Sequence, residues 1–382
     1  MAFFSFSLLK EPFIYLSTKI ESNQKYYSKD ITLRKELNNI NKTTSLIKLN
    51  YEKRININKI GKKLLICLPP KFGLGDAIEY GIALNSLAKS NKFKKIGIAF
   101  CNNHLFIFKN FFSFLNVYPL LISQDQINNY DTIFHITLEI KALKFQKYNR
   151  SNIALEICKY FNVNMIEFKI DDFSNRKNNK KSISVFPVST STIRVLPLYI
   201  LEKIIDKFKD DYEIKIVLDD SEYSKFILNK IQNYDVEFIN PKDVKSLVLE
   251  ISKIYFGIFV DSGPLHIAKS FNKKGIFIET SVSKEILLNN SNNILPIKNK
   301  YISNYCTGPC GLVDLFAYDG VVGCYETHKI SFEDINLLKS FKKLQRWDKK
   351  DNNSHFFSNP VGCVKKIDIK NIIELIKREL KE

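Results

Sequence analysis

The sequence contains no apolar run approaching the ~20 residues that a membrane-spanning helix needs, although 45% of its 382 residues are hydrophobic. The apolar first nine residues are followed at once by Lys10 and Glu11 and have no basic residue before them, so they do not form a signal-peptide pattern. The sequence therefore predicts a cytoplasmic protein whose contact with the inner face of a membrane is at most peripheral.

Arginine is scarce, since only seven of the 58 basic residues are arginine, and lysine supplies most of the net charge of +18. The charge is scattered, and no basic stripe carries the interleaved aromatic residues that are typical of nucleic-acid binders. We therefore expect no specific nucleic-acid partner. A mild attraction to nucleotides or to an anionic membrane surface is the expected effect of the charge.

A complete dinucleotide-binding fingerprint is also missing. The turn KFGLGDAI at residues 71–78 has Ile78 where the third glycine would stand, and no acidic residue ends a second strand ~20 positions later. These absences argue against a dehydrogenase. Asp76 in this turn has two interpretations. It caps the helix that follows, or it is a carboxylate at the carboxyl edge of a parallel sheet, where a base could take a proton from a hydroxyl.

Apolar strands and helical patterns alternate along most of the chain. The expected strands are 62–69, 96–100, 132–136, 182–187, 213–218, 235–239, 254–260 and 275–279, and the expected helices are 76–88, 105–115, 197–208, 221–232, 243–252 and 368–381. The fully polar segment 174–181 is the best linker candidate. Alternation of this kind predicts two α/β domains, each with its own parallel sheet.

We expect four segments in all. Residues 1–60 form a polar leader with some helix, and residues 61–175 and 182–345 form two Rossmann-like domains. Residues 346–382 form a C-terminal tail and helix.

The stretch FVDSGPLHIAKSF at residues 259–271 joins the expected strand 254–260 to a helix. Pro264 suits a first helical position, and Ser262 or Asp261 can cap it. Unpaired N–H groups and the helix dipole at such a start favour a bound anion. An ordinary strand-to-helix connection is the alternative.

The turn GLGDAI at 73–78 and the motif DSGPLHIAKSF at 261–271 together resemble glycosyltransferase family 9, the heptosyltransferase family. Between them, FPVST at 186–190 and RVLP at 194–197 are similar to that family's strand-end segment ahead of a basic residue. The resemblance covers roughly residues 62–380. It implies an α/β protein of the GT-B class, in which two Rossmann-like domains with parallel sheets face a central cleft. The first domain would bind the acceptor and the second the nucleotide-sugar.

The resemblance also implies an inverting transfer without a catalytic metal, from a nucleotide-diphospho-sugar such as ADP-heptose to a lipopolysaccharide core or a protein. Asp76 would deprotonate the acceptor hydroxyl, and Arg194, where the family more often has lysine, would stabilise the departing diphosphate. The amides of Gly263 and Leu265 would cradle that diphosphate. The implied donor-binding residues are Ser189, Thr190, Glu222, Asp261, Ser262, Gly263, Pro264, Leu265 and His266.

Plainer alternatives stand beside these roles. His266 can be a packed histidine on a helix, and Asp219, Asp220 and Glu222 can be a solvated loop after a strand. The family's usual Thr or Pro shortly after the Gly-Asp turn is replaced by Glu79-Tyr80-Gly81, which bears on acceptor and donor identity. The alternative function is a non-catalytic nucleotide-sugar-binding or scaffold protein that retains the fold.

Seven cysteines fall into two groups. Cys67, Cys101 and Cys158 lie in apolar segments and are expected to be buried thiols. The other four are Cys306, Cys310, Cys324 and Cys363. In a cytoplasmic protein such a cluster favours metal ligands over disulfides, and plain thiols are the alternative. Relatives in the resembling family bind iron through four cysteines, which implies a structural iron or zinc ion here.

Overall fold

A computed structural model of the chain divides into two compact units, which are described separately. The first comprises Met1–Phe145 with Ile153–Ile166, and the second comprises Gln146–Asn152 with Glu167–Glu382. The structure describes residues 4–8, 13–15, 18–20, 24–28, 31–44, 47–51, 60–69, 72–100, 104–118, 121–136, 151–170, 181–288, 291, 293–304, 306–312, 315, 323–326 and 354–381. Most of the expected linker, and Cys101, lie outside these residues. In this part of the chain no helix is long and apolar enough to cross a membrane.

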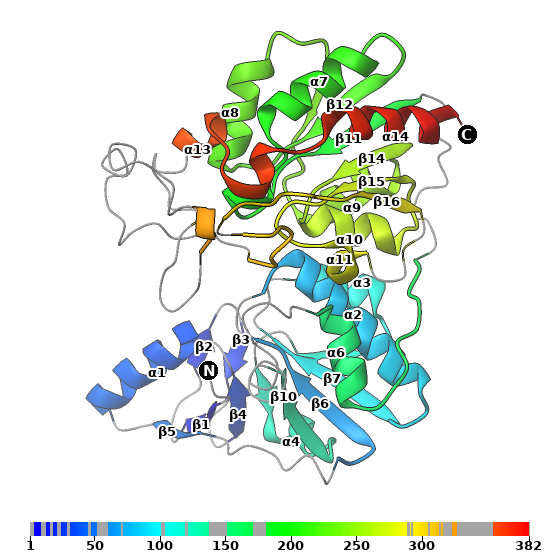
Figure 1. Cartoon of the computed structure of the whole chain (residues 1–382). Helices are drawn as coiled ribbons and strands as arrows, with labels where there is room; N and C mark the ends of the chain where they lie inside the picture. The colour runs from blue at the N-terminus through cyan, green and yellow to red at the C-terminus, as the bar shows by residue number, and fades with distance from the viewer. Residues whose placement is uncertain are drawn as a thin grey trace. The chain divides into compact units, whose positions relative to one another are not determined.

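The N-terminal segment holds more structure than the expected leader. The alternating sequence FSFSL forms β1 (Phe4–Leu8), which pairs antiparallel with β4 (Lys25–Ser28) and β5 (Ile47–Tyr51). β4 also pairs with β9 (Ile122–Ser123), so the sheet order is β5-β1-β4-β9. A hairpin of β2 (Phe13–Tyr15) and β3 (Thr18–Ile20), and helix α1 (Ile31–Thr44), complete the segment (Figure 1). Its pairing with β9 makes it part of the first unit.

The first unit also contains a parallel sheet of order β10-β6-β7-β8. Its elements are β6 (Lys63–Cys67), β7 (Lys95–Ala99), β8 (Asn116–Tyr118) and β10 (Thr132–His135), with α2 (Leu74–Lys89), α3 (Leu105–Phe111), α4 (Gln124–Ile127) and α6 (Ile153–Tyr160). The apolar run of β6 is buried at four of its five positions, as a central parallel strand requires. The expected strands and helices of this region are confirmed, whereas β8, α4 and α6 were not expected.

The second unit is built on a six-stranded parallel sheet of order β13-β12-β11-β14-β15-β16. Its strands are β11 (Ser182–Phe186), β12 (Glu213–Val217), β13 (Glu237–Ile239), β14 (Phe256–Phe259), β15 (Gly275–Ile278) and β16 (Ile294–Ile297). Its helices are α7 (Leu198–Phe208), α8 (Glu222–Ile231), α9 (Val244–Ser252), α10 (Gly263–Ser270), α11 (Lys284–Leu287), α13 (Ser354–Ser358) and α14 (Ile369–Lys381). Every strand predicted here is present, and the sheet is parallel throughout.

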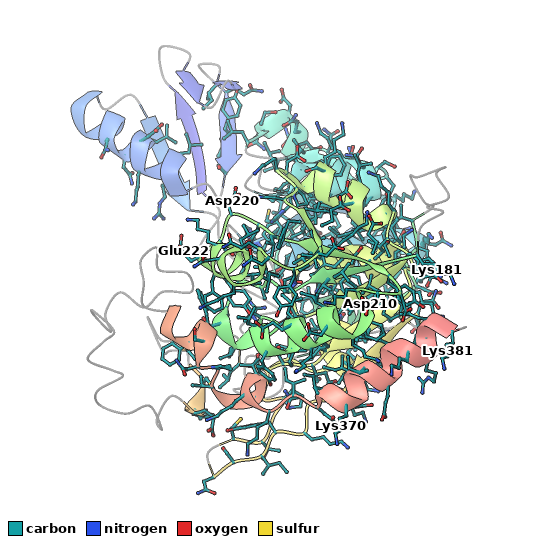
Figure 2. The ribbon with its side chains drawn as sticks, turned by 90° about the horizontal axis from the view of Figure 1, so that it is seen from above. Lys181, Asp210, Asp220, Glu222, Lys370 and Lys381 are labelled. Carbon is teal, nitrogen blue, oxygen red and sulfur yellow. The ribbon has the colours of Figure 1, made fainter. Side chains whose placement is uncertain are left out.

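The C-terminal helix α14 belongs to the core of the second unit. Its residues Ile372, Ile376 and Leu380 recur at helical spacing and are buried in the same cluster as α7 and the sheet. The opposite side of the helix is charged, and Lys370 and Lys381 lie at its two ends (Figure 2). The expected C-terminal helix is therefore confirmed within one residue at its start.

Candidate functional site

Two loops of the second unit meet at the point where the order of its strands reverses. β11 has β12 on one side and β14 on the other, and the rings of Phe186 and Phe259, at the carboxyl ends of β11 and β14, stack with centroids 5.0 Å apart. In open α/β sheets, ligands bind outside the carboxyl ends of the strands at such a switch point. The loops after these two strands carry most of the residues that the sequence singled out.

Arg194 ties the two loops together. Its Nη1 lies 2.9 Å from Asp261 Oδ2, and its Nη2 donates a hydrogen bond to Thr190 Oγ1. Ser189 Oγ donates to the Asp261 carbonyl oxygen. The side chains of Arg194 and Asp261 are only 12% and 9% exposed, so the ion pair is largely withdrawn from water. The sequence predicted these four residues as site residues, and the structure brings all four together.

In the part of the chain that the structure describes, one nitrogen of the Arg194 guanidinium is left without a partner. Arg194 Nε is buried and meets no hydrogen-bond partner within the described residues. The other two nitrogens are occupied by Asp261 and Thr190. A buried, unsatisfied N–H beside a neutralised carboxylate can donate a hydrogen bond to an additional anionic oxygen at low cost.

Helix α10 begins directly beside this ion pair. Ser262 occupies the N-cap position, but its hydroxyl donates to the Val260 carbonyl oxygen at 3.3 Å and makes no capping hydrogen bond. The Leu265 N–H donates to the Ser262 carbonyl oxygen at 3.2 Å, and the Leu265 side chain is fully buried. In this conformation the Leu265 amide is therefore not offered to a ligand, contrary to the sequence-based expectation. Gly263, which is partly exposed, remains the amide candidate at this helix start.

His266 is on the first turn of α10 but is only 6% exposed. Its carbonyl oxygen accepts a hydrogen bond from Ser270 Oγ at 3.0 Å. Pro264, in the same turn, lies in the position where its missing N–H costs nothing. The burial of His266 fits both alternatives stated for it, a packed histidine and a ligand contact beneath the helix start.

The three carboxylates after β12 are exposed and each has a partner of its own. Asp219 Oδ1 accepts hydrogen bonds from the Ser221 N–H at 3.0 Å and Ser224 Oγ at 2.7 Å, at the start of α8. A hydrogen bond from Asn240, followed by the charge of Lys242, lowers the pKa of Asp220. Glu222, which is labelled in Figure 2, pairs with Lys225 at 2.6 Å, one helix turn away. This loop follows β12, the strand beside β11, and its hydrogen bonds satisfy groups at the start of α8.

In the first unit, Asp76 occupies the third position of α2, after the N-cap Gly73. Its Oδ2 accepts the Gly73 N–H at 2.9 Å, so one carboxylate oxygen satisfies the open end of the helix. The turn follows β6, which lies between β7 and β10 at the switch point of this sheet. Asp76 thus has the helix-start role that the sequence left open, and it lies at an edge where parallel sheets bind ligands.

His104 is a neighbour of this turn that the sequence analysis did not identify. Its Nε2 lies 3.0 Å from the Phe72 carbonyl oxygen, to which it donates, and its ring lies 5.2 Å from the Phe72 ring. Burial lowers the pKa of His104, and the Phe72 carbonyl and the charge of Asp76 oppose that shift. The signal available in the sequence was its position just after β7, the strand beside β6.

The four C-terminal cysteines influence one another but do not form a ready metal site. Burial, followed by the Cys310 thiol, raises the pKa of Cys306 to about 12. Burial, followed by Cys324, Cys310 and Cys306, raises the pKa of Cys363 well above its ordinary value. Within the described residues, no three His, Cys, Asp or Glu side chains are gathered closely enough to hold an ion. Within the described residues these four thiols, and those of the buried Cys67 and Cys158, form no disulfide.

This thiol region packs against the turn that carries Arg194. Cys324 forms one buried cluster with Ile193, Leu315 and Phe356. The short helix η5 (Gly362–Lys365), which contains Cys363, contacts η2 (Thr192–Arg194). Ile193, the residue before Arg194, is therefore packed in the thiol region.

Comparison with known proteins gives matches in structure but not in sequence. No family model matches the chain, and no curated protein is detectably similar to it in sequence. The iron-containing dodecameric glycosyltransferase TibC from enterotoxigenic E. coli H10407 is 13% identical and has a TM-score of 0.55, with 88% of this chain and 81% of that chain covered. A family 9 glycosyl transferase from Veillonella parvula DSM 2008 is 11% identical and has a TM-score of 0.54, with 85% and 98% covered.

The two matches with TM-scores above 0.5, to TibC and to the Veillonella parvula glycosyl transferase, support the architecture. A third match, TibC in complex with ADP-D-beta-D-heptose, is 12% identical with a TM-score of 0.49 and covers 80% of this chain and 79% of that chain. At identities this low, structural similarity reports on the fold, since unrelated functions share folds of this kind. The chain is an α/β protein of the GT-B fold class, with two Rossmann-like units that each contain a parallel sheet.

Proposed function

We propose that the protein is an inverting glycosyltransferase that moves a sugar from a nucleotide-diphospho-sugar, with ADP-heptose as the first donor to test. The observation that carries this proposal is the cluster of Ser189, Thr190, Arg194 and Asp261 at the switch point of the second sheet, directly before α10. The similarity in fold to TibC, an iron-containing glycosyltransferase, and the sequence motif that resembles family 9 support the same function.

The donor diphosphate would bind against the start of α10. The Gly263 N–H and the positive end of the helix dipole favour phosphate oxygens there. The ion pair with Arg194 cancels the charge of Asp261, so the carboxylate does not repel the diphosphate. The unpartnered Nε–H of Arg194 then supplies a charge-assisted hydrogen bond as negative charge builds on the departing phosphate.

The acceptor hydroxyl would lose its proton to Asp76. Gly73 N–H occupies Oδ2, and we assign the proton to the second oxygen, Oδ1. The acceptor in this proposal is a lipopolysaccharide core or a protein, handled in the cytoplasm. A base at this position contributes typically ~10²–10⁴-fold in rate.

We further propose that Cys306, Cys310, Cys324 and Cys363 together hold one structural iron or zinc ion. Four thiolates are a suitable donor set for a closed tetrahedral site, and the thiols lie within electrostatic range of one another. Binding requires the side chains to converge further than they do here. The ion would stabilise this region of the chain and would take no part in the transfer.

The test is a binding screen over nucleoside diphosphates and nucleotide-sugars, followed by transfer assays with Asp76→Asn. The expected result is donor binding by both proteins and loss of transfer in the variant. Donor binding without transfer by the parent protein, on every acceptor, would favour the alternative of a non-catalytic nucleotide-sugar-binding protein. Equal transfer by the variant and the parent would remove Asp76 as the base.

A further inference from the structure

The amino-terminal edge of the first unit's parallel sheet carries a row of lysines. Lys62 and Lys63 lead into β6, and Lys94 and Lys95 lead into β7. Lys63 and Lys95 are partners in the parallel register, and the Lys94 N–H donates to the Lys62 carbonyl oxygen at 2.8 Å. The backbone pairing therefore fixes four lysines on adjacent positions of two neighbouring strands.

These lysines have little negative charge around them. Lys62, Lys63 and Lys94 are exposed, and none of the four forms an ion pair within the described residues. The ammonium of Lys95 lies 4.9 Å from the centre of the Tyr130 ring. Asp131 is an acidic residue on this edge, and its Oδ2 accepts a hydrogen bond from the Lys63 backbone N–H at 3.0 Å. Like charges on directly opposite strand positions destabilise a sheet, so an anionic partner would relieve a cost that the fold carries.

An exposed aromatic side chain lies at the same edge. Phe114 is 44% exposed and comes two residues before β8. Asn116, the first residue of β8, pairs with Gly97 of β7, and Phe114 lies in the turn that leads into β8 at this amino-terminal edge. An exposed aromatic residue beside a row of lysines is the combination that proteins use at the boundary between water and an anionic bilayer.

We propose that this edge, formed by Lys62, Lys63, Lys94, Lys95 and Phe114, docks on the anionic headgroups of a phospholipid bilayer. The lysine ammonium groups lie against the lipid phosphates, and the Phe114 ring enters the interface. A bilayer suits this surface better than a nucleic acid does. The described edge offers one exposed aromatic ring and no arginine, whereas single-stranded nucleic acids are bound by several stacking aromatics along a groove. The inference does not depend on the proposed transfer activity.

The test is flotation of the purified chain with vesicles, without any nucleotide. We expect binding to vesicles of phosphatidylcholine with phosphatidylglycerol, none to phosphatidylcholine alone, and loss of binding at high salt. Each lysine near an anionic surface is worth about fivefold, so Lys62→Gln with Lys94→Gln should weaken binding by about 25-fold. Lys366→Gln with Lys370→Gln, two exposed lysines of the second unit, makes the same change in net charge and should leave binding unchanged.

Three results would overturn the proposal. The first is binding to neutral vesicles that equals binding to anionic vesicles. The second is binding by the Lys62 and Lys94 double variant that equals binding by the parent. The third is binding of the parent to a random oligonucleotide that is tighter than its binding to vesicles and is lost in the double variant. Phe114→Ser adds a second check, because it removes the apolar contribution and leaves every charge in place. Its binding should be weaker at low salt than that of the parent, and unchanged binding would contradict the role of the ring.

Discussion

The ion pair between Arg194 and Asp261 is expected to stabilise the second unit as well as to form the donor site. At 2.9 Å and an effective dielectric constant of about 20, the attraction between the two charges is about 6 kcal/mol before desolvation. Because both side chains are largely buried, removing one partner leaves a charge without compensation, which typically costs about 3–5 kcal/mol. We therefore expect Arg194→Met to lower the free energy of unfolding by about 3 kcal/mol. For a unit of this size, that corresponds to a fall in Tm of about 6–12 °C.

A double-mutant cycle measures this interaction directly. Arg194→Met, Asp261→Asn and the double variant would be unfolded in urea and followed by circular dichroism. The double variant should recover part of the loss, with a coupling energy of about 1–3 kcal/mol. Glu222→Gln gives the control, because it breaks an ion pair with Lys225 that is about half exposed, and its loss of stability should be much smaller than that of Arg194→Met. Additive losses of less than about 1 kcal/mol each would refute the reasoning.

Three further predictions concern single side chains. Because burial depresses the pKa of His104 below its ordinary value of 6.5, stability should be full above about pH 6.5 and should fall as the pH drops through the lower folded pKa. His104→Gln should therefore give a flatter dependence of Tm on pH between about 7 and 5. Gly81→Ala should destabilise the first unit by about 1–3 kcal/mol, since the added Cβ would lie 1.9 Å from the Phe112 ring. In urea unfolding, combining it with Phe112→Leu should recover part of that loss. Gly362→Ala should cost about 1–2 kcal/mol in thermal unfolding, because Gly362 has a φ of +63° and the new Cβ would lie 3.2 Å from Cys324 Sγ.

Elements with a strong local pattern were predictable from the sequence, and elements that depend on distant partners were not. The apolar run of β11 and the helical spacing in α7 led to the right elements within a residue or two. The short strand β1 has a clear alternation, but it lies in a polar segment and is completed by β5 and, through β4, by β9. Its partners are set by tertiary contacts that no local pattern reveals.

The site shows the same division between local and distant information. The motif containing Asp261 could be identified from its spacing. Its ion-pair partner Arg194 is 67 residues away, and the sequence predicted it only as a residue that stabilises the departing diphosphate. The contact between His104 and Phe72 joins two loops on neighbouring strands, so only the sheet order reveals it. Leu265 was predicted as an amide donor because the helix start was assumed to be fully open, whereas the tight turn uses its N–H.

The packing of the second unit also changes what the cysteine cluster can affect. From the sequence alone, the resemblance implies a structural metal site there with no direct part in the sugar chemistry. In the structure, Cys324 and Ile193 belong to one buried cluster, and η5 with Cys363 contacts the turn that ends at Arg194. Because packed side chains transmit small displacements, we expect a shift in the thiol region to displace the backbone of Arg194, the residue that pairs with Asp261. The state of the four thiols should therefore influence donor affinity through the position of Arg194, even though none of the cysteines contacts the donor in the proposed mechanism.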